Sequence, residues 1–213
     1  MILDLHLHSE LSDDSRATVE SYLKILARKR AERPLDGIVV TEHRRFDFDV
    51  DYRPLEDVYG MRILRGAEVE TEYGHILIYG VNEDMLRRFD FANVRLPAQE
   101  VIDEVARMGG IAAPCHPGRA NVGLCAHYEK KPVLEGVIAV EALNGGSKAA
   151  ENERVGELME TYGYFGFGGS DSHLVSFVGI CATEFEERIA DEQGLVEALK
   201  GGRYRAVDFR TRG

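Results

Sequence analysis

The stretch Ile2-Leu3-Asp4-Leu5-His6-Leu7-His8 is an apolar run that ends in two histidines. If it forms a β-strand, the i, i+2 spacing places the side chains of His6 and His8 on one face. Neutral imidazole nitrogen and carboxylate oxygen are ligands that Zn²⁺, Mn²⁺ and Fe²⁺ accept in proteins. The stretch therefore predicts a short buried strand, Ile2–Leu5, whose end carries part of a metal site.

The same arrangement recurs along the chain, because six of the seven histidines stand in clusters with acids that follow or flank apolar runs. The later clusters are Glu42-His43 after Gly37–Thr41, Glu68 and His75 around a hairpin pattern, His116 after Gly110–Cys115, and Asp171-Ser172-His173 after Gly166–Ser170. Asp171 and His173 repeat the i, i+2 spacing of the first pair. Because one ion cannot use so many ligands, the sequence predicts a multinuclear metal centre.

Strand and helix signals alternate between these clusters. Predicted strands cover Ile2–Leu5, Gly37–Thr41, Met61–Val69, His75–Val81, Ile111–Cys115, Val137–Val140, Tyr164–Phe167, Val178–Thr183 and Tyr204–Phe209. Predicted helices begin after Thr18, at Pro97, near Glu151 and after Asp191. The chain has no internal repeat, low-complexity tract or linker, so we expect a single domain over residues 1–213.

This alternation favours an α/β fold with parallel strands and helices packed outside them. The metal-type residues fall at or just beyond the C-terminal ends of strands, apart from Glu68 and His75. In a closed barrel, all these ends open on the face that hosts the active site, whereas an open sheet gathers ligands only near its switch point. Five strand ends with ligands therefore predict a small or distorted β/α barrel of seven or eight strands.

Composition limits the classes of partner and location. The net charge of −11 argues against a protein that mainly grips phosphate backbones, although a local basic pocket stays possible. Cys115, Cys125 and Cys181 are odd in number and lack CxxC spacing, which favours a reducing compartment. No apolar stretch approaches the ~18 residues of a membrane span, and no leader pattern is present. We expect a cytoplasmic protein without a membrane partner; the oligomeric state stays open.

Six motifs in order resemble the PHP (polymerase and histidinol phosphatase) family. They are Asp4-Leu5-His6-Leu7-His8-Ser9, Thr41-Glu42-His43, Gly66-Ala67-Glu68-Val69, Gly74-His75, Cys115-His116-Pro117 and Gly169-Ser170-Asp171-Ser172-His173. Each motif is weak alone, but the ordered set spans nearly the whole chain. The resemblance implies a distorted seven-stranded β/α barrel with a trinuclear metal centre that hydrolyses phosphate esters.

The resemblance also implies a role for each matching residue. The implied ligands are His6, His8, Glu68 and Asp171 for one metal, Glu68, His75 and His116 for a second, and His43, His173 and Asp13 for a third. The loop reads Ser12-Asp13-Asp14, so Asp14 is the alternative to Asp13. Glu42 stands where the family usually has aspartate, which affects the surroundings of the ligands more than the ligands themselves.

Hydrolysis of a phosphate ester also needs positive donors for the phosphoryl oxygens. Arginine suits this role because its planar fork matches phosphate geometry. Arg119, in Cys115-His116-Pro117-Gly118-Arg119, is the predicted catalytic residue, with a rim salt bridge as its alternative; Arg44 is a weaker candidate. No residue is identified as the general acid. His127 is expected to be an uninvolved surface residue, and Asn144-Gly145-Gly146 a turn.

Three classes of function stay open at this stage. The first is a phosphatase or phosphodiesterase acting on a small phosphorylated metabolite or nucleotide, with three divalent ions (Zn²⁺, Mn²⁺ or Fe²⁺) as cofactors. The second is a 3'-5' exonuclease or polymerase-associated nuclease, which the acidic charge disfavours. The third is a non-catalytic metal-binding module, which the complete ligand set disfavours. The sequence therefore predicts a phosphoric ester hydrolase with a small substrate.

Overall fold

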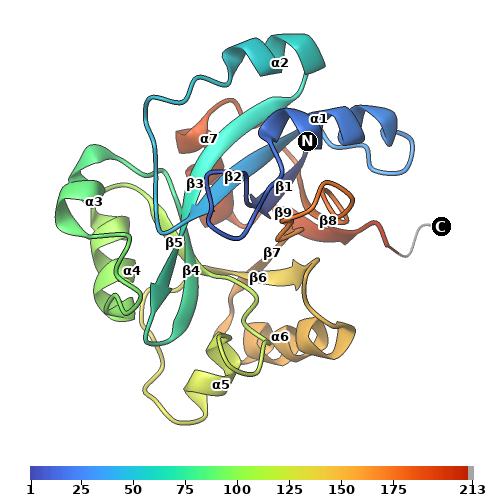
Figure 1. The fold of residues 1–213 in the computed structure, drawn as a ribbon. Helices are drawn as coiled ribbons and strands as arrows, with labels where there is room; N and C mark the ends of the chain where they lie inside the picture. Colours follow the sequence, from blue (N-terminus) through green and yellow to red (C-terminus); the bar gives the residue numbers. More distant parts are fainter. Residues whose placement is uncertain (211–213) are drawn as a thin grey trace.

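A computed structural model describes residues 1–210, which fold into nine strands and seven helices (Figure 1). The strands are β1 (Ile2–Leu7), β2 (Gly37–His43), β3 (Arg62–Thr71), β4 (Gly74–Tyr79), β5 (Ile111–Pro114), β6 (Ala139–Asn144), β7 (Phe165–Gly169), β8 (Cys181–Phe185) and β9 (Tyr204–Asp208). The helices are α1 (Val19–Arg28), α2 (Arg53–Tyr59), α3 (Glu83–Arg88), α4 (Ala98–Arg107), α5 (Leu124–Tyr128), α6 (Ala149–Tyr162) and α7 (Glu192–Gly201).

Seven strands form one curled sheet in the order β5-β4-β3-β2-β1-β8-β9, and β6 and β7 form a separate parallel pair. Only part of the large sheet is parallel: β1, β2 and β3 run together, whereas β4 and β8 run against their neighbours. The expectation of parallel strands is therefore corrected for β5, β8 and β9, whereas the predicted hairpin of β3 and β4 is confirmed. The β3–β4 connection is only Glu72-Tyr73, and a link that short joins antiparallel strands.

The two sheets meet at β1, which has different partners at its two ends. Ile2 and Leu3 pair with β8, whereas Leu7 forms a parallel bridge to Ser172, just after β7. The amide of His8 donates to the carbonyl of Ser172 at 3.0 Å. At the other edge, β6 contacts β5. This arrangement brings the ends of β1, β2, β3 and β7 together at one side of the molecule.

A register irregularity in β1 turns its two histidines toward this side. Leu3 and Leu5 pack in one hydrophobic cluster, with Phe167 and Tyr79, but Leu7 packs in another. A regular strand would place all three leucines on one face. The register shift between Asp4 and Leu7 breaks that alternation. It allows His6 and His8 to be fully buried at the end of the strand.

Local sequence signals account for the helix boundaries. The hydroxyl of Thr18 accepts from the amide of Ser21 at 3.1 Å, and the carboxylate of Asp191 accepts from that of Gly194 at 2.8 Å, so both predicted caps are confirmed. The unpredicted helices α2, α3 and α5 are short and bury at most two residues each, so they lack an extended apolar stripe. None of the described helices combines the length and apolar character needed to cross a bilayer.

Candidate metal centre

Four buried side chains converge where β1, β3 and the segment after β7 meet. Nε2 of His6 lies 3.0 Å from Oε2 of Glu68 and 3.5 Å from Oδ1 of Asp171. Nε2 of His8 lies 3.1 Å and 3.4 Å from the same two oxygens. One ligand atom from each of the four residues falls within 4.8 Å of the others. This group matches the ligand set that the resemblance implies for one metal.

Glu68 also belongs to a second group, through its other oxygen. Oε1 of Glu68 lies 2.7 Å from Nδ1 of His75 and 3.2 Å from Nε2 of His116. His75 reaches this point because β4 runs against β3, so the start of β4 lies beside the end of β3. This explains why His75 joins the site although it does not lie at the C-terminal end of a strand. The two oxygens of Glu68 face different ligand groups, as a carboxylate that bridges two metals requires.

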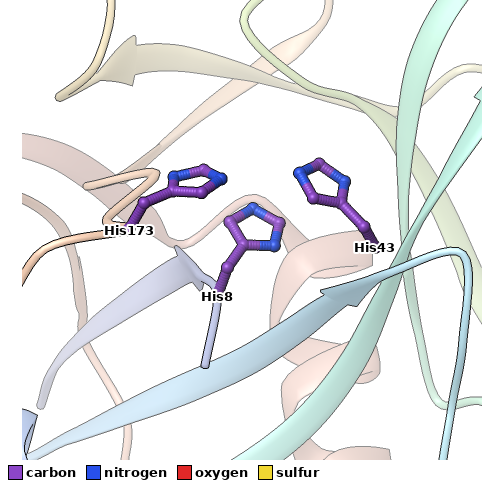
Figure 2. Close-up of side chains that lie close together, drawn as sticks. All are labelled: His8, His43 and His173. Atoms are coloured by element: carbon purple, nitrogen blue, oxygen red, sulfur yellow. The ribbon is translucent and has the colours of Figure 1, made fainter. Parts of the chain in front are cut away.

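Three histidine rings form the third group (Figure 2). The ring of His8 stacks on that of His43 at 4.0 Å and on that of His173 at 4.4 Å between centroids. Oδ2 of Asp14 lies 3.3 Å from Nε2 of His43 and 3.2 Å from Nε2 of His173. His8 therefore belongs to two groups, and a carboxylate of the first loop completes the third.

That carboxylate belongs to Asp14, whereas Asp13 had been preferred from the sequence. The side chain of Asp13 turns outward, is 67% exposed, and pairs with the guanidinium of Arg44. Consecutive residues in a loop commonly point in different directions, and only one of the two can face His43. The structure thus brings Asp14, and not Asp13, to the histidines.

A buried acid that the sequence did not single out, Glu141, supports the first group from behind. Its Oε1 lies 2.9 Å from Nδ1 of His6, and its Oε2 accepts from the amide of His116 at 2.7 Å and from the side chain of Asn144 at 2.8 Å. A proton held on Nδ1 leaves Nε2 of His6 with a free lone pair toward the cluster. Gly169 permits this approach, because a Cβ there would lie 2.5 Å from Cβ of His6.

Arg119 lies behind Asp171, with its Nη2 and Nε engaged. Its Nη2 donates to Oδ2 of Asp171 at 2.6 Å and to Oδ1 of Asn144 at 2.9 Å, and its Nε donates to Ser147 at 3.0 Å. Asn144 therefore contributes its side chain to the site as well as a turn. Because Arg119 holds one oxygen of Asp171, the other, Oδ1, is left facing His6 and His8.

Glu42 ties the first loop to the end of β2. Its carboxylate accepts from the amide of Ser9 at 3.1 Å and from the hydroxyl of Ser12 at 2.5 Å, and also from the hydroxyl of Ser9. The hydroxyl of Ser12 also accepts from the amide of His43 at 3.0 Å. Glutamate thus takes the place of the family's usual aspartate as a clamp on the loop that carries Asp14.

The backbone around the cluster is strained at three positions. Arg44, His116 and Asp171 have φ values of 56°, 34° and 52°, which place them in the left-handed region that residues other than glycine seldom adopt. All three either belong to the ligand groups or follow a ligand directly. Such outliers gather at functional sites, where the surrounding structure holds them in place.

The electrostatics of the cluster suit cations. Burial opposes the charged form of Glu68, but His6 and the hydrogen bonds from His116 and His75 hold the pKa of its carboxyl well below the usual range. Burial likewise opposes protonation of His8, yet hydrogen bonds to Asp171 and Glu68 raise its pKa to about 9. The carboxylates are therefore ionised, and protons on imidazole occupy the place that metal ions would take.

Two orphaned nitrogens also fit bound metal. Nδ1 of His43 and Nδ1 of His116 are buried and have no hydrogen-bond partner among the described residues, although Nδ1 of His43 lies 3.3 Å from Oε2 of Glu68. Burial, with a further contribution from the nearby His8, lowers the pKa of His43 to about 4, although Glu68 partly offsets this, so its imidazole is neutral at pH 7. A neutral imidazole with an unused buried nitrogen is a typical metal ligand, since an unsatisfied buried polar atom is otherwise costly.

His127, by contrast, stands apart from the three ligand groups, on α5. Its ring lies 5.9 Å from that of Tyr73. The structure therefore separates this histidine from the other six, as the sequence predicted. It provides a histidine for matched control substitutions.

Comparisons with known proteins bear on the family and the fold. A sequence profile described as PHP-associated matches residues 149–204. An uncharacterized protein of Methanocaldococcus jannaschii is 27% identical over 127 residues, which cover 55% of this chain and 68% of that protein. Both findings concern the sequence.

Solved structures show the same fold at low identity. PsfC from Pseudomonas syringae is 19% identical with a TM-score of 0.70, over 97% of this chain and 91% of that one. The lesion-specific endonuclease PfuEndoQ from Pyrococcus furiosus is 16% identical with a TM-score of 0.66, over 97% of this chain and 58% of that one. A candidate metal-dependent phosphoesterase from Bifidobacterium adolescentis is 14% identical with a TM-score of 0.56, over 92% and 95%.

At these identities the solved structures speak for the fold alone, and the sequence evidence comes from the PHP-associated match and the six ordered motifs. The fold, the match over residues 149–204 and the ordered motifs point the same way, and together they support a PHP-domain protein.

Proposed function

We propose that this protein is a metal-dependent hydrolase of phosphate esters that acts on a small phosphorylated metabolite or nucleotide. The observation that carries the proposal is the convergence of three ligand groups that share Glu68 and His8. Shared ligands hold ions close together, and clustered ions suit the several negatively charged oxygens of a phosphate ester. We further propose that the curled sheet and the β6–β7 pair together make a distorted barrel like that of the family, built here from nine strands instead of the expected seven.

The proposed ligand sets follow the three groups. They are His6, His8, Glu68 and Asp171; Glu68, His75 and His116; and His43, His173 and Asp14, with Asp14 in place of Asp13 and with His8, which also lies in the third group, assigned to the first ion. Nitrogen and carboxylate donors suit Zn²⁺, Mn²⁺ and Fe²⁺. We propose that up to three such ions bind in each chain.

Bound ions of this kind would lower the pKa of a water from about 15.7 to about 7 and neutralise phosphoryl oxygens. The side chains around the ligands hold them in the required orientation. Glu141 sets the tautomer of His6, and Arg119 fixes the orientation of Asp171. His173 and Asp14 are 28% and 51% exposed, so substrate approaches from their side, and the fully buried His6 lies at the floor.

A nuclease is the second candidate, because the fold resembles that of PfuEndoQ. The net charge of −11 favours the small substrate, since a groove for nucleic acid needs clustered Lys and Arg. Cys115, Cys125 and Cys181 are free and buried, which agrees with the proposed cytoplasmic location.

One experiment tests metal content and substrate class together. Protein purified without chelators and reloaded with Mn²⁺, Zn²⁺ or Fe²⁺ should contain more than one ion per chain by elemental analysis, with three at full loading. It should hydrolyse phosphomonoesters or small phosphodiesters faster than single-stranded DNA. A stoichiometry of one or less would contradict the multinuclear centre, and faster cleavage of DNA would favour the nuclease.

A further inference from the structure

A second arginine, Arg44, lies at the exposed edge of the metal centre. It directly follows His43, and its amide donates to the carbonyl of Glu68 at 2.8 Å. Its left-handed backbone, with φ of 56°, turns the chain sharply at the end of β2. The backbone of Arg44 is therefore fixed between two proposed ligands, on the side from which substrate approaches.

The guanidinium of Arg44 is held by two acids that are exposed to solvent. Its Nη2 pairs with Asp13, which is 67% exposed, and its Nη1 lies 3.4 Å from Oε1 of Glu70, which is 27% exposed. Ion pairs of this kind contribute little to stability and exchange readily with other charges. Asp13 is also the neighbour of Asp14, which faces His43 and His173. The Arg44–Asp13 pair thus stands at the rim of the third ligand group.

Arg119 differs in each of these respects. Its Nη2 pairs with Asp171, which is only 5% exposed, and also donates to Asn144, while its Nε donates to Ser147. To turn Nη2 to a phosphate, Arg119 would have to release a buried carboxylate that faces the cluster, and that is costly. Arg44 would only have to release a solvated one. Arg44 is therefore the better receptor for an anionic substrate.

We propose that Arg44 binds the phosphoryl oxygens of the substrate, and that Asp13 is the counterion that the substrate displaces. The inference rests on the proposed phosphoesterase function and makes Arg44 its specificity-determining cation. A guanidinium presents two parallel donors, so a phosphate can replace the carboxylate without loss of geometry. No bond is made or broken in the exchange, and Asp13 returns to water.

The exchange gives opposite expectations for the two partners. Arg44→Ala removes the receptor, so KM for an aryl phosphate should rise by about tenfold or more. Asp13→Asn removes the competitor, so KM should fall by up to about fivefold, the range expected for an exposed pair. Metal content should stay unchanged in both variants. Arg44→Lys should lie between Arg44→Ala and the wild type, because a point charge replaces the fork.

Arg45→Ala is the matched control, since it removes the same charge one residue later. Arg45 lies 3.8 Å from Asp47 and 3.4 Å from the carbonyl of Leu11, and it makes no contact with a proposed ligand that the structure records. The KM of Arg45→Ala should match that of the wild type. If its KM rose as much as that of Arg44→Ala, the effect would come from general surface charge, and the proposal would be overturned.

Binding of inorganic phosphate to the metal-loaded protein, measured by calorimetry, separates this inference from the proposed function. If phosphate binds and Arg44→Ala weakens binding about tenfold, Arg44 is the receptor even if no ester in the panel is hydrolysed. If esters are hydrolysed but Arg44→Ala has the same phosphate affinity and the same KM as the wild type, the phosphoesterase function stands and Arg44 is not the receptor. Loss of a metal ion in Asp13→Asn would make Asp13 a ligand and overturn its role as counterion.

Discussion

The inner and outer parts of the metal centre are built differently. The inner part, His6, Glu68 and His116, is at most 2% exposed, and buried groups fix each orientation. The outer part, Asp14, His43 and His173, is 12–51% exposed, and Asp14 and His173 come from loops rather than strands. Loops adjust where strands do not, so the inner part should bind metal tightly and the outer part more weakly.

Removal of a shared ligand should have the largest effect. His8 belongs to two of the three groups, so His8→Ala should lower kcat/KM by more than about 10³-fold, beyond the loss expected for a residue that only orients a ligand. His173→Ala should remove about one ion and leave the inner ions in place. Steady-state kinetics and elemental analysis of both variants check this.

His127→Ala, the control, should change neither quantity. If His173→Ala removed more metal than His8→Ala, the division into a tight inner part and a weak outer part would be wrong.

Glu141→Gln tests how strongly the buried carboxylate behind His6 contributes to the metal affinity of the inner part. The amide can still accept a hydrogen bond from His6 but loses the negative charge, so metal affinity should fall by about 10- to 100-fold. Competition with a chelator measures this. Glu135→Gln, the same substitution at an exposed position, should leave metal affinity unchanged. If both variants lost metal affinity equally, Glu141 would have no specific role in the site.

Arg119→Ala should have the smallest of these effects, and it acts on stability as well as on metal. Loss of the guanidinium removes the cation that pairs with Oδ2 of Asp171 and one of the donors to Oδ1 of Asn144, which should cost about 2 kcal/mol of unfolding free energy. Denaturant unfolding of the metal-free protein measures it. Arg154→Ala, which breaks an exposed pair with Glu129, should stay within about 0.5 kcal/mol. If Arg119→Ala left the stability unchanged but raised KM, Arg119 would again be the better candidate for the phosphate receptor.

Sequence reasoning located the ligands in or beside the strands well, because an apolar strand next to a histidine limits both the position and the direction of that side chain. His6, His8, His75 and His116 lie together as expected, and the caps at Thr18 and Asp191 are observed. Loop residues were harder, because Asp13 and Asp14 are equivalent in sequence and only the path of the loop distinguishes them.

Two further features lay beyond sequence reasoning for a related reason. Glu141 was missed because it stands alone in a strand, and its one signal was an acid after the apolar Val140. Arg119 was predicted to bind phosphate, with a rim salt bridge as the alternative, because nothing local shows that Asp171, 52 positions away, lies within hydrogen-bonding distance. The antiparallel β8 similarly depends on long-range pairing with β1. In each case the deciding partner is distant in the chain.

The left-handed backbone at Arg44, His116 and Asp171 bears on how this protein could evolve. Glycine at these positions would relieve strain of about 1 kcal/mol each, yet it would delete the side chain that the site uses. Selection for thermal stability alone would therefore erode the metal centre, and selection for activity would keep the strain.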